Sequence, residues 1–122
     1  MKILVVDDSV SMRQMLSIIL KGAGHTVVEA PDGAVGLAQF DESIDVMVTD
    51  YNMPNMGGIE LIKAVRAGTV NRQVPILMLT TESDASKKTE GRDAGATAWI
   101  TKPFNRDSLL ATLDKITRTV DF

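Results

Sequence analysis

Several polar residues follow directly after short apolar runs, where their side chains could do chemistry together. Five residues stand in this position: Asp7, Asp8, Asp50, Thr80 and Lys102. If the apolar runs are parallel strands of one sheet, their carboxyl ends meet at a single edge. We therefore expect three carboxylates, one hydroxyl and one ammonium group to converge there.

The charge balance of this group predicts a cation. The three aspartates contribute −3 and Lys102 contributes +1, which leaves −2. A single aspartate could be an ordinary helix cap, but three carboxylates at one edge repel one another and raise one another's pKa. One divalent cation would neutralise the site. Oxygen ligands without cysteine or histidine favour a hard ion such as Mg²⁺.

The same parts could carry out phosphoryl transfer. A carboxylate can act as a nucleophile and form an acyl phosphate, and Mg²⁺ with a lysine can stabilise the transferring group. The hydroxyl of Thr80 could donate a hydrogen bond to the product. The residues alone leave open which aspartate is attacked. Asp50 is favoured because Asp7 and Asp8 are adjacent and form a natural metal pair.

Alternating elements must position these residues. Apolar runs that read as buried strands span 3–6, 26–30, 45–49, 76–79 and 97–101. Several are continuous blocks of apolar residues, which is typical of a parallel sheet covered on both faces. Amphipathic helical patterns lie between and after them. This alternation predicts a doubly wound, flavodoxin-like α/β fold with five helices.

The helix boundaries are marked by capping residues and glycines. Asp8 or Ser9 could cap the first helix, which Gly22 and Gly24 would end, and Asp32 could cap the second. The remaining helices are expected to open at Gly57-Gly58, to span 83–95, and to carry Leu109, Leu113, Ile116 and Val120.

The helix expected at 83–95 differs from the others. It contains no large apolar residue, and Gly91 interrupts it, at a cost of about 1 kcal/mol relative to alanine. We expect it to be the least stable element.

Length and composition exclude several classes of protein. The 122 residues suit one domain, 1–122. The net charge of −3 and pI of about 5.0, without a basic run, argue against nucleic-acid binding. No apolar stretch approaches the roughly 18 residues of a membrane span. The absence of cysteine fits a reducing compartment, so we expect a cytoplasmic protein.

Four segments resemble the signature segments of response-regulator receiver domains: 5–9 (VVDDS), 50–58 (DYNMPNMGG), 79–82 (LTTE) and 101–104 (TKPF). Their order and spacing match across essentially the whole chain, and 50–58 is especially similar to stand-alone chemotaxis receivers. The resemblance implies the strand order 2-1-3-4-5, which is the flavodoxin-like order. It also implies a cis peptide between Lys102 and Pro103.

The resemblance also implies roles in metal binding and phosphorylation. Asp50 would accept a phosphoryl group from a histidine kinase. The side chains of Asp8 and Asp50 and the backbone carbonyl of Asn52 would ligate Mg²⁺, with Asp7 binding mainly through water. Because the only histidine, His25, precedes the second strand at the far end of the sheet, the phosphodonor must be another molecule.

The resemblance further implies a switch. Thr80 and Lys102 would contact the phosphoryl group, and Trp99 corresponds to an aromatic residue that moves in the family. Because Trp is larger than the Tyr that the family often carries, we expect Trp99 to stay outward or partly buried while the helix at 83–95 reorganises. Asn52 and Glu82 would tune the phosphate lifetime.

The implied output is protein binding through the fourth helix, fifth strand and fifth helix. A flagellar motor switch protein is the expected target of a monomeric chain that is not an enzyme beyond assisting its own phosphorylation and dephosphorylation. A relay shuttle or a phosphate sink fits the same sequence. An Mg²⁺-dependent aspartyl phosphatase and a flavodoxin-like electron carrier are weaker alternatives, since adjacent Asp7 and Asp8 depart from the phosphatase D-x-D pattern and would repel a flavin phosphate.

Overall fold

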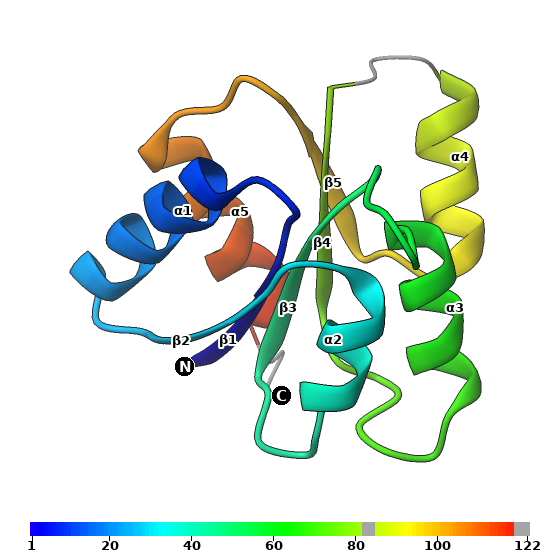
Figure 1. Ribbon diagram of the computed structural model, residues 1–122. Coiled ribbons are helices and arrows are strands. Elements are labelled where there is room, and N and C mark those ends of the chain that lie inside the picture. The colour runs from blue at the N-terminus through cyan, green and yellow to red at the C-terminus, as the bar shows by residue number, and fades with distance from the viewer. Residues whose placement is uncertain (82–84, 119–122) are drawn as a thin grey trace.

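The protein folds into a five-stranded parallel sheet flanked by five helices (Figure 1). The computed structural model describes residues 1–81 and 85–118. The elements are β1 (Lys2–Val6), α1 (Val10–Gly22), β2 (Thr26–Ala30), α2 (Gly33–Gln39), β3 (Val46–Asp50), α3 (Gly58–Ala67), β4 (Ile76–Thr80), α4 (Ala85–Ala94), β5 (Ala98–Thr101) and α5 (Arg106–Thr117). The strand order β2-β1-β3-β4-β5 confirms the predicted fold.

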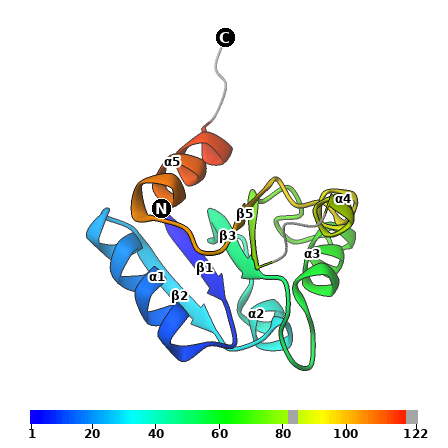
Figure 2. The ribbon, with the colours of Figure 1, turned by 90° about the horizontal axis from the view of Figure 1, so that it is seen from above.

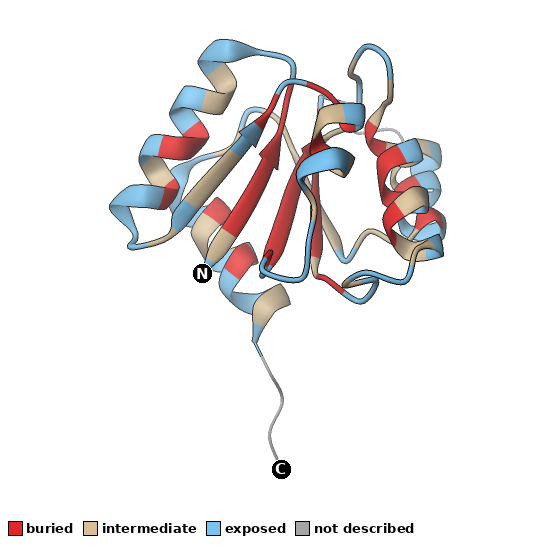
Figure 3. Cartoon of the chain, turned by 60° about the horizontal axis from the view of Figure 1, so that its bottom comes forward, coloured by how far each residue is buried: buried red, intermediate tan, exposed pale blue. Residues whose placement is uncertain are grey.

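Helices cover both faces of the sheet and form two apolar cores. Helices α1 and α5 lie on one face, and α2, α3 and α4 lie on the other (Figure 2). The central strands β1, β3 and β4 are buried almost throughout (Figure 3). Burial from both sides explains their continuous apolar sequence. None of the helices among the described residues combines the length and apolar character needed to cross a bilayer.

Polar side chains cap helices α1, α2 and α5. Ser9 accepts a hydrogen bond from the backbone N–H of Met12, which identifies it, rather than Asp8, as the cap of α1. Asp32 caps α2 as predicted, through the N–H of Val35. Helix α1 also ends at Gly22 as expected. These caps satisfy N–H groups that the first helical turn leaves without partners.

Several boundaries differ from the prediction by a few residues. Strand β3 extends through Asp50, because Asp50 pairs with Leu79 in the parallel ladder. Helix α5 is described to Thr117, and Val120, which was expected to belong to it, lies outside the described residues. The expected start of α4 at residue 83 also lies outside them.

Helix α4 has little apolar anchorage. Its buried residues are Gly91 and Ala94. A Cβ atom at Gly91 would lie 2.5 Å from the Cε atom of Met78 on β4, so glycine allows a close approach to the sheet. The sequence marked Gly91 as an interruption; the structure shows that it also has a packing role. Low stability of α4 remains a prediction.

Candidate metal centre

Three carboxylates converge at the carboxyl edge of the sheet. Asp7 and Asp8 follow β1, and Asp50 ends the neighbouring strand β3. One oxygen atom from each lies within 4.8 Å of the others. Asp7 is 1% exposed, the Asp50 side chain is 13% exposed, and Asp8 faces solvent. Adjacent parallel strands thus bring the predicted cluster together.

Lys102 supplies the positive charge within this cluster. Its Nζ atom lies 3.1 Å from Asp50 Oδ1 and 3.5 Å from Asp7 Oδ2. The backbone N–H of Lys102 donates to the carbonyl oxygen of Thr80, 2.7 Å away, which continues the β4–β5 pairing. The peptide between Lys102 and Pro103 is cis, as the family resemblance implied.

Asp7 is held by two groups from the start of α1. The backbone N–H of Ser9 donates to Asp7 Oδ1 at 2.9 Å, and Arg13 Nη1 donates to the Asp7 carbonyl oxygen at 2.6 Å. Arg13 also pairs with Glu29 on β2, with 3.6 Å between Nε and Oε1. Arg13 was not among the site residues predicted from the sequence. Its position in the first turns of the helix that follows the acids places it near them, but nothing in the sequence indicates where its side chain reaches.

The surroundings of Asp50 disfavour its charge. Burial, followed by the negative charge of Asp7, raises the pKa of Asp50, and Lys102 and the N–H of Tyr51 oppose this rise. The Tyr51 N–H donates to Asp50 Oδ1 at 2.9 Å. Asp7 and Asp50 together carry more negative charge than the one ammonium of Lys102 balances, so additional positive charge would stabilise the ionised form of Asp50.

The loop after Asp50 is closed tightly at Gly58. The backbone N–H of Gly58 donates to the Tyr51 carbonyl oxygen at 3.0 Å. A Cβ atom there would lie 2.2 Å from the Asp50 carbonyl oxygen, which no side chain could accommodate without moving backbone. Farther along, Asn55 Nδ2 donates to Asp32 Oδ2 at 3.0 Å and ties the loop to α2. The hydrogen bond between Asn55 and Asp32 was not predicted from the sequence.

The other predicted residues surround the cluster at different depths. Thr80 is buried at the end of β4, and Asn52 is exposed in the loop after β3. Trp99 on β5 is half-buried against α4, with Lys88 Nζ 5.8 Å from a ring centre. Glu82 lies outside the described residues. The roles assigned to these four residues stay predictions.

The donor set fits a hard divalent cation. The clustered side chains offer only carboxylate oxygens, which Mg²⁺ and Ca²⁺ prefer. Asp8 lies on the solvent side, where ligand waters could complete the coordination. The net charge of Asp7, Asp8, Asp50 and Lys102 is −2, which one such ion balances.

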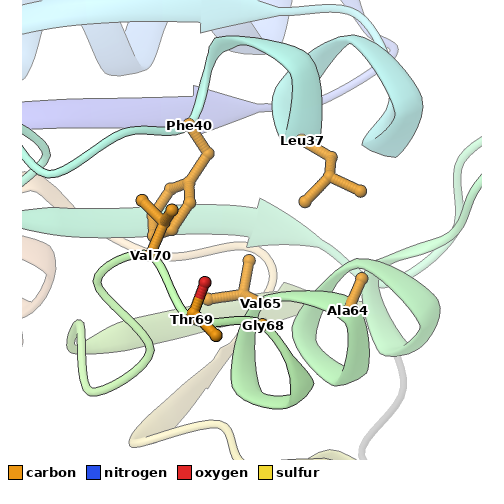
Figure 4. Close-up of a pocket in the computed structure, with 7 residues that line it drawn as sticks. All are labelled: Leu37, Phe40, Ala64, Val65, Gly68, Thr69 and Val70. Atoms are coloured by element: carbon orange, nitrogen blue, oxygen red, sulfur yellow. The ribbon is translucent and has the colours of Figure 1, made fainter.

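An apolar pocket of about 230 Å³ lies between the ends of α2 and α3 (Figure 4). Leu37 of α2 and Phe40, which directly follows α2, line one side of it, and Val65 of α3 and Val70 of the following loop line the other. These segments lead into β3 and β4, so the pocket is at the opposite edge of the sheet from the carboxylates. It is not part of the metal centre.

Comparison with known proteins identifies the family. Residues 3–114 match the response regulator receiver domain. The chain belongs to this family. It is 38% identical to the chemotaxis protein CheY of Pseudomonas aeruginosa, covering 99% of both chains, and 40% identical to CheY-3 of Vibrio cholerae, covering 95% and 91%. The solved structure of V. cholerae CheY4 superposes with a TM-score of 0.89 at 49% identity, covering 94% of this chain and 97% of that one.

Membership of the receiver-domain family indicates what kind of site the acidic edge is. The chain is a CheY-like receiver domain, and the cluster of Asp7, Asp8 and Asp50 fits a Mg²⁺ site. CheY-like receivers are signalling proteins rather than enzymes of the ordinary kind. The family and the geometry together support a phosphoacceptor switch.

Proposed function

We propose that this receiver domain, residues 1–122, accepts a phosphoryl group on Asp50 from a histidine kinase, with Mg²⁺ as cofactor. The observation that carries the proposal is the meeting of three carboxylates within 4.8 Å, with Lys102 Nζ 3.1 Å from Asp50 Oδ1. Such an arrangement places a nucleophile beside the positive charge that a transferring phosphoryl group requires.

The exposure and hydrogen bonds of the carboxylates favour Asp50 as the nucleophile. Asp7 is nearly inaccessible, and each of its carboxylate oxygens has a partner, Ser9 or Lys102. Asp50 is more exposed, and within residues 1–81 and 85–118 both hydrogen bonds that it accepts go to Oδ1. This leaves Oδ2 available for attack or for a metal ion.

The proposed reaction is in-line phosphoryl transfer. An Asp50 oxygen attacks phosphorus while the bond from phosphorus to the donor's imidazole nitrogen breaks, and its electron pair returns to that nitrogen. Lys102 pairs with the oxygens of the transferred group, and Thr80 donates a hydrogen bond to it. When bound by Asp8, Asp50 and the Asn52 carbonyl, with Asp7 acting through water, Mg²⁺ supplies further charge neutralisation.

The proposed output surface comprises α4, β5 and α5. The curated relatives are named as chemotaxis proteins, which favours a flagellar motor switch protein as the target of a cytoplasmic monomer. A phosphorelay shuttle or a phosphate sink is the second candidate, because the residues that accept the phosphoryl group would be the same. Asn52 and Glu82 are proposed to set the phosphate lifetime.

A panel of autophosphorylated histidine kinases tests this function. We expect at least one to transfer its label to the chain within minutes, and chelation of Mg²⁺ to stop the transfer. The Asp45→Asn variant is the control, because Asp45 is exposed at the opposite edge of the sheet and should leave transfer unchanged. Absence of transfer from every kinase and from acetyl phosphate would refute the proposal.

Binding to a motor-switch peptide separates the two outputs. A motor regulator should retain the peptide when phosphorylated and lose it as the Asp50→Asn variant. A phosphorelay shuttle or a phosphate sink should not bind the peptide either when phosphorylated or as the Asp50→Asn variant. It should instead return its phosphoryl group to a histidine-containing domain.

A further inference from the structure

Helix α4 is joined to the phosphoacceptor loop through the hydroxyl of Tyr51. This hydroxyl donates to the Glu90 carboxylate, with 3.1 Å to each oxygen. It also accepts a hydrogen bond from Lys87 Nζ at 3.1 Å, and the same Nζ lies 5.0 Å from the centre of the ring. Both partners belong to α4. One tyrosine therefore binds two successive turns of the helix.

The backbone of the same tyrosine contacts the phosphoacceptor. Its N–H donates to Asp50 Oδ1, and its carbonyl oxygen accepts from the N–H of Gly58. The Tyr51 ring packs on the apolar core under α3 and α4. Displacement of the backbone at Tyr51 would therefore be transmitted through a supported ring to the hydroxyl.

Helix α4 depends on such polar contacts. Its buried positions are a glycine and an alanine, so apolar packing contributes little to its position. At its C-terminal end, Arg66 Nε and Nη2 both donate to the carbonyl oxygen of Gly95. Nearer the carboxylates, the hydrogen bond from the Tyr51 hydroxyl to Glu90 holds α4 in a comparable way.

We propose that Tyr51 is a positioning residue that couples the phosphorylation state of Asp50 to the position of α4. The inference rests on the proposed function. A carboxylate oxygen is a stronger hydrogen-bond acceptor than the uncharged carbonyl oxygen of an acyl phosphate. Phosphorylation thus weakens the Tyr51 N–H contact, shifts the tyrosine and releases its hold on Glu90 and Lys87. A helix with few apolar contacts is readily biased by such a local change.

Amide hydrogen exchange of residues 85–94 tests the coupling, with and without Mg²⁺ and beryllofluoride as the phosphoryl mimic. In the wild type, the mimic should speed exchange. Tyr51→Phe keeps the ring and removes the hydroxyl, so it should speed exchange about five- to tenfold without the mimic, which lies within the range of a typical net hydrogen-bond contribution. The mimic should then change exchange by less than about twofold.

Two further variants define the contact. Glu90→Gln keeps an acceptor for the tyrosine hydroxyl and should retain part of the response, whereas Glu90→Ala should behave like Tyr51→Phe. Asp93→Asn is the matched control, because this exposed acid lies on the same helix and pairs with the adjacent Arg92. It should respond to the mimic like the wild type.

The outcomes separate the coupling from the proposed function. Binding of the mimic is scored independently, as thermal stabilisation that Asp50→Asn lacks. If the wild type binds the mimic and Tyr51→Phe shows an undiminished response in α4, the coupling is wrong while the phosphoacceptor function stands. If the wild type does not bind the mimic at all, the proposed function fails and the coupling fails with it.

Discussion

Replacing Asp50 with asparagine will reduce phosphoryl incorporation from acetyl phosphate by roughly 10⁴-fold or more, the order expected when a covalent nucleophile is removed. The side-chain amide has nearly the same shape but lacks the negative charge and the nucleophilic oxygen pair. Intact-protein mass spectrometry after incubation with acetyl phosphate and Mg²⁺ measures the effect. Continued incorporation at a wild-type rate would assign the reaction to another carboxylate, with Asp8 the nearest exposed candidate.

The same substitution should stabilise the metal-free protein at neutral pH. Burial and Asp7 raise the pKa of Asp50 in the fold, so the folded state binds its proton more tightly than the unfolded chain. The Asp50 contribution to folding is therefore most favourable below the ordinary value of 3.8 and is lost as pH rises through the raised pKa.

Denaturant unfolding without Mg²⁺ measures that gain. At pH 7 the Asp50→Asn variant should be more stable than the wild type by about 0.5–2 kcal/mol, the usual size of a single stabilising substitution. The difference should shrink as pH falls through the raised pKa, and also when Mg²⁺ binds the wild type. If the Asp50→Asn variant were less stable than the wild type at pH 7, the ionised Asp50 side chain would not be destabilising the fold.

Replacing Lys102 with methionine should reduce phosphotransfer by about 10²- to 10³-fold, the usual cost of removing one preorganised group that stabilises transition-state charge. Lys102 Nζ contacts both Asp7 and Asp50, and methionine keeps much of the length without the charge. The initial rate of phosphorylation by acetyl phosphate at saturating Mg²⁺ is the measurement. Lys115→Met makes the same exchange on the exposed surface of α5 and should leave the rate unchanged.

The Lys102→Met substitution should change Mg²⁺ affinity and the rate of phosphotransfer in opposite directions. Because Lys102 and a cation both neutralise Asp7 and Asp50, loss of the ammonium should tighten Mg²⁺ binding while phosphotransfer slows. A general loss of structure would weaken both. Unchanged phosphotransfer in Lys102→Met would show that the lysine serves only to balance charge.

The convergence of the acids was predictable because it depends on topology. In a parallel sheet, a residue that ends a buried strand must lie at the carboxyl edge, whatever the details of packing. Asp7 directly follows β1 and Asp50 ends the neighbouring strand β3, so the strand order alone brings them together. The helix caps at Ser9 and Asp32 could be predicted from the sequence for a similar reason, since capping depends on a few local residues.

The contacts of Arg13 and Tyr51 were not predictable in this way. Each depends on the rotation of a helix about its axis and on the reach of a long side chain across a gap between elements. The packing role of Gly91 could not be predicted either, because its contact with Met78 depends on how closely α4 approaches the sheet. Hydrophobic periodicity carries no signal for that depth in a helix that lacks large apolar residues.

Calorimetric titration with Mg²⁺ tests most directly whether the acidic edge is built for a hard cation. The wild type should bind one ion per chain, and Asp8→Asn should weaken that binding at least about tenfold, as loss of even indirect support for a metal does. Asp45→Asn should bind like the wild type. Two results would contradict a cation site at this edge. One is Mg²⁺ binding that is undetectable in the wild type, and the other is Mg²⁺ binding by Asp8→Asn and Asp50→Asn that is as strong as in the wild type.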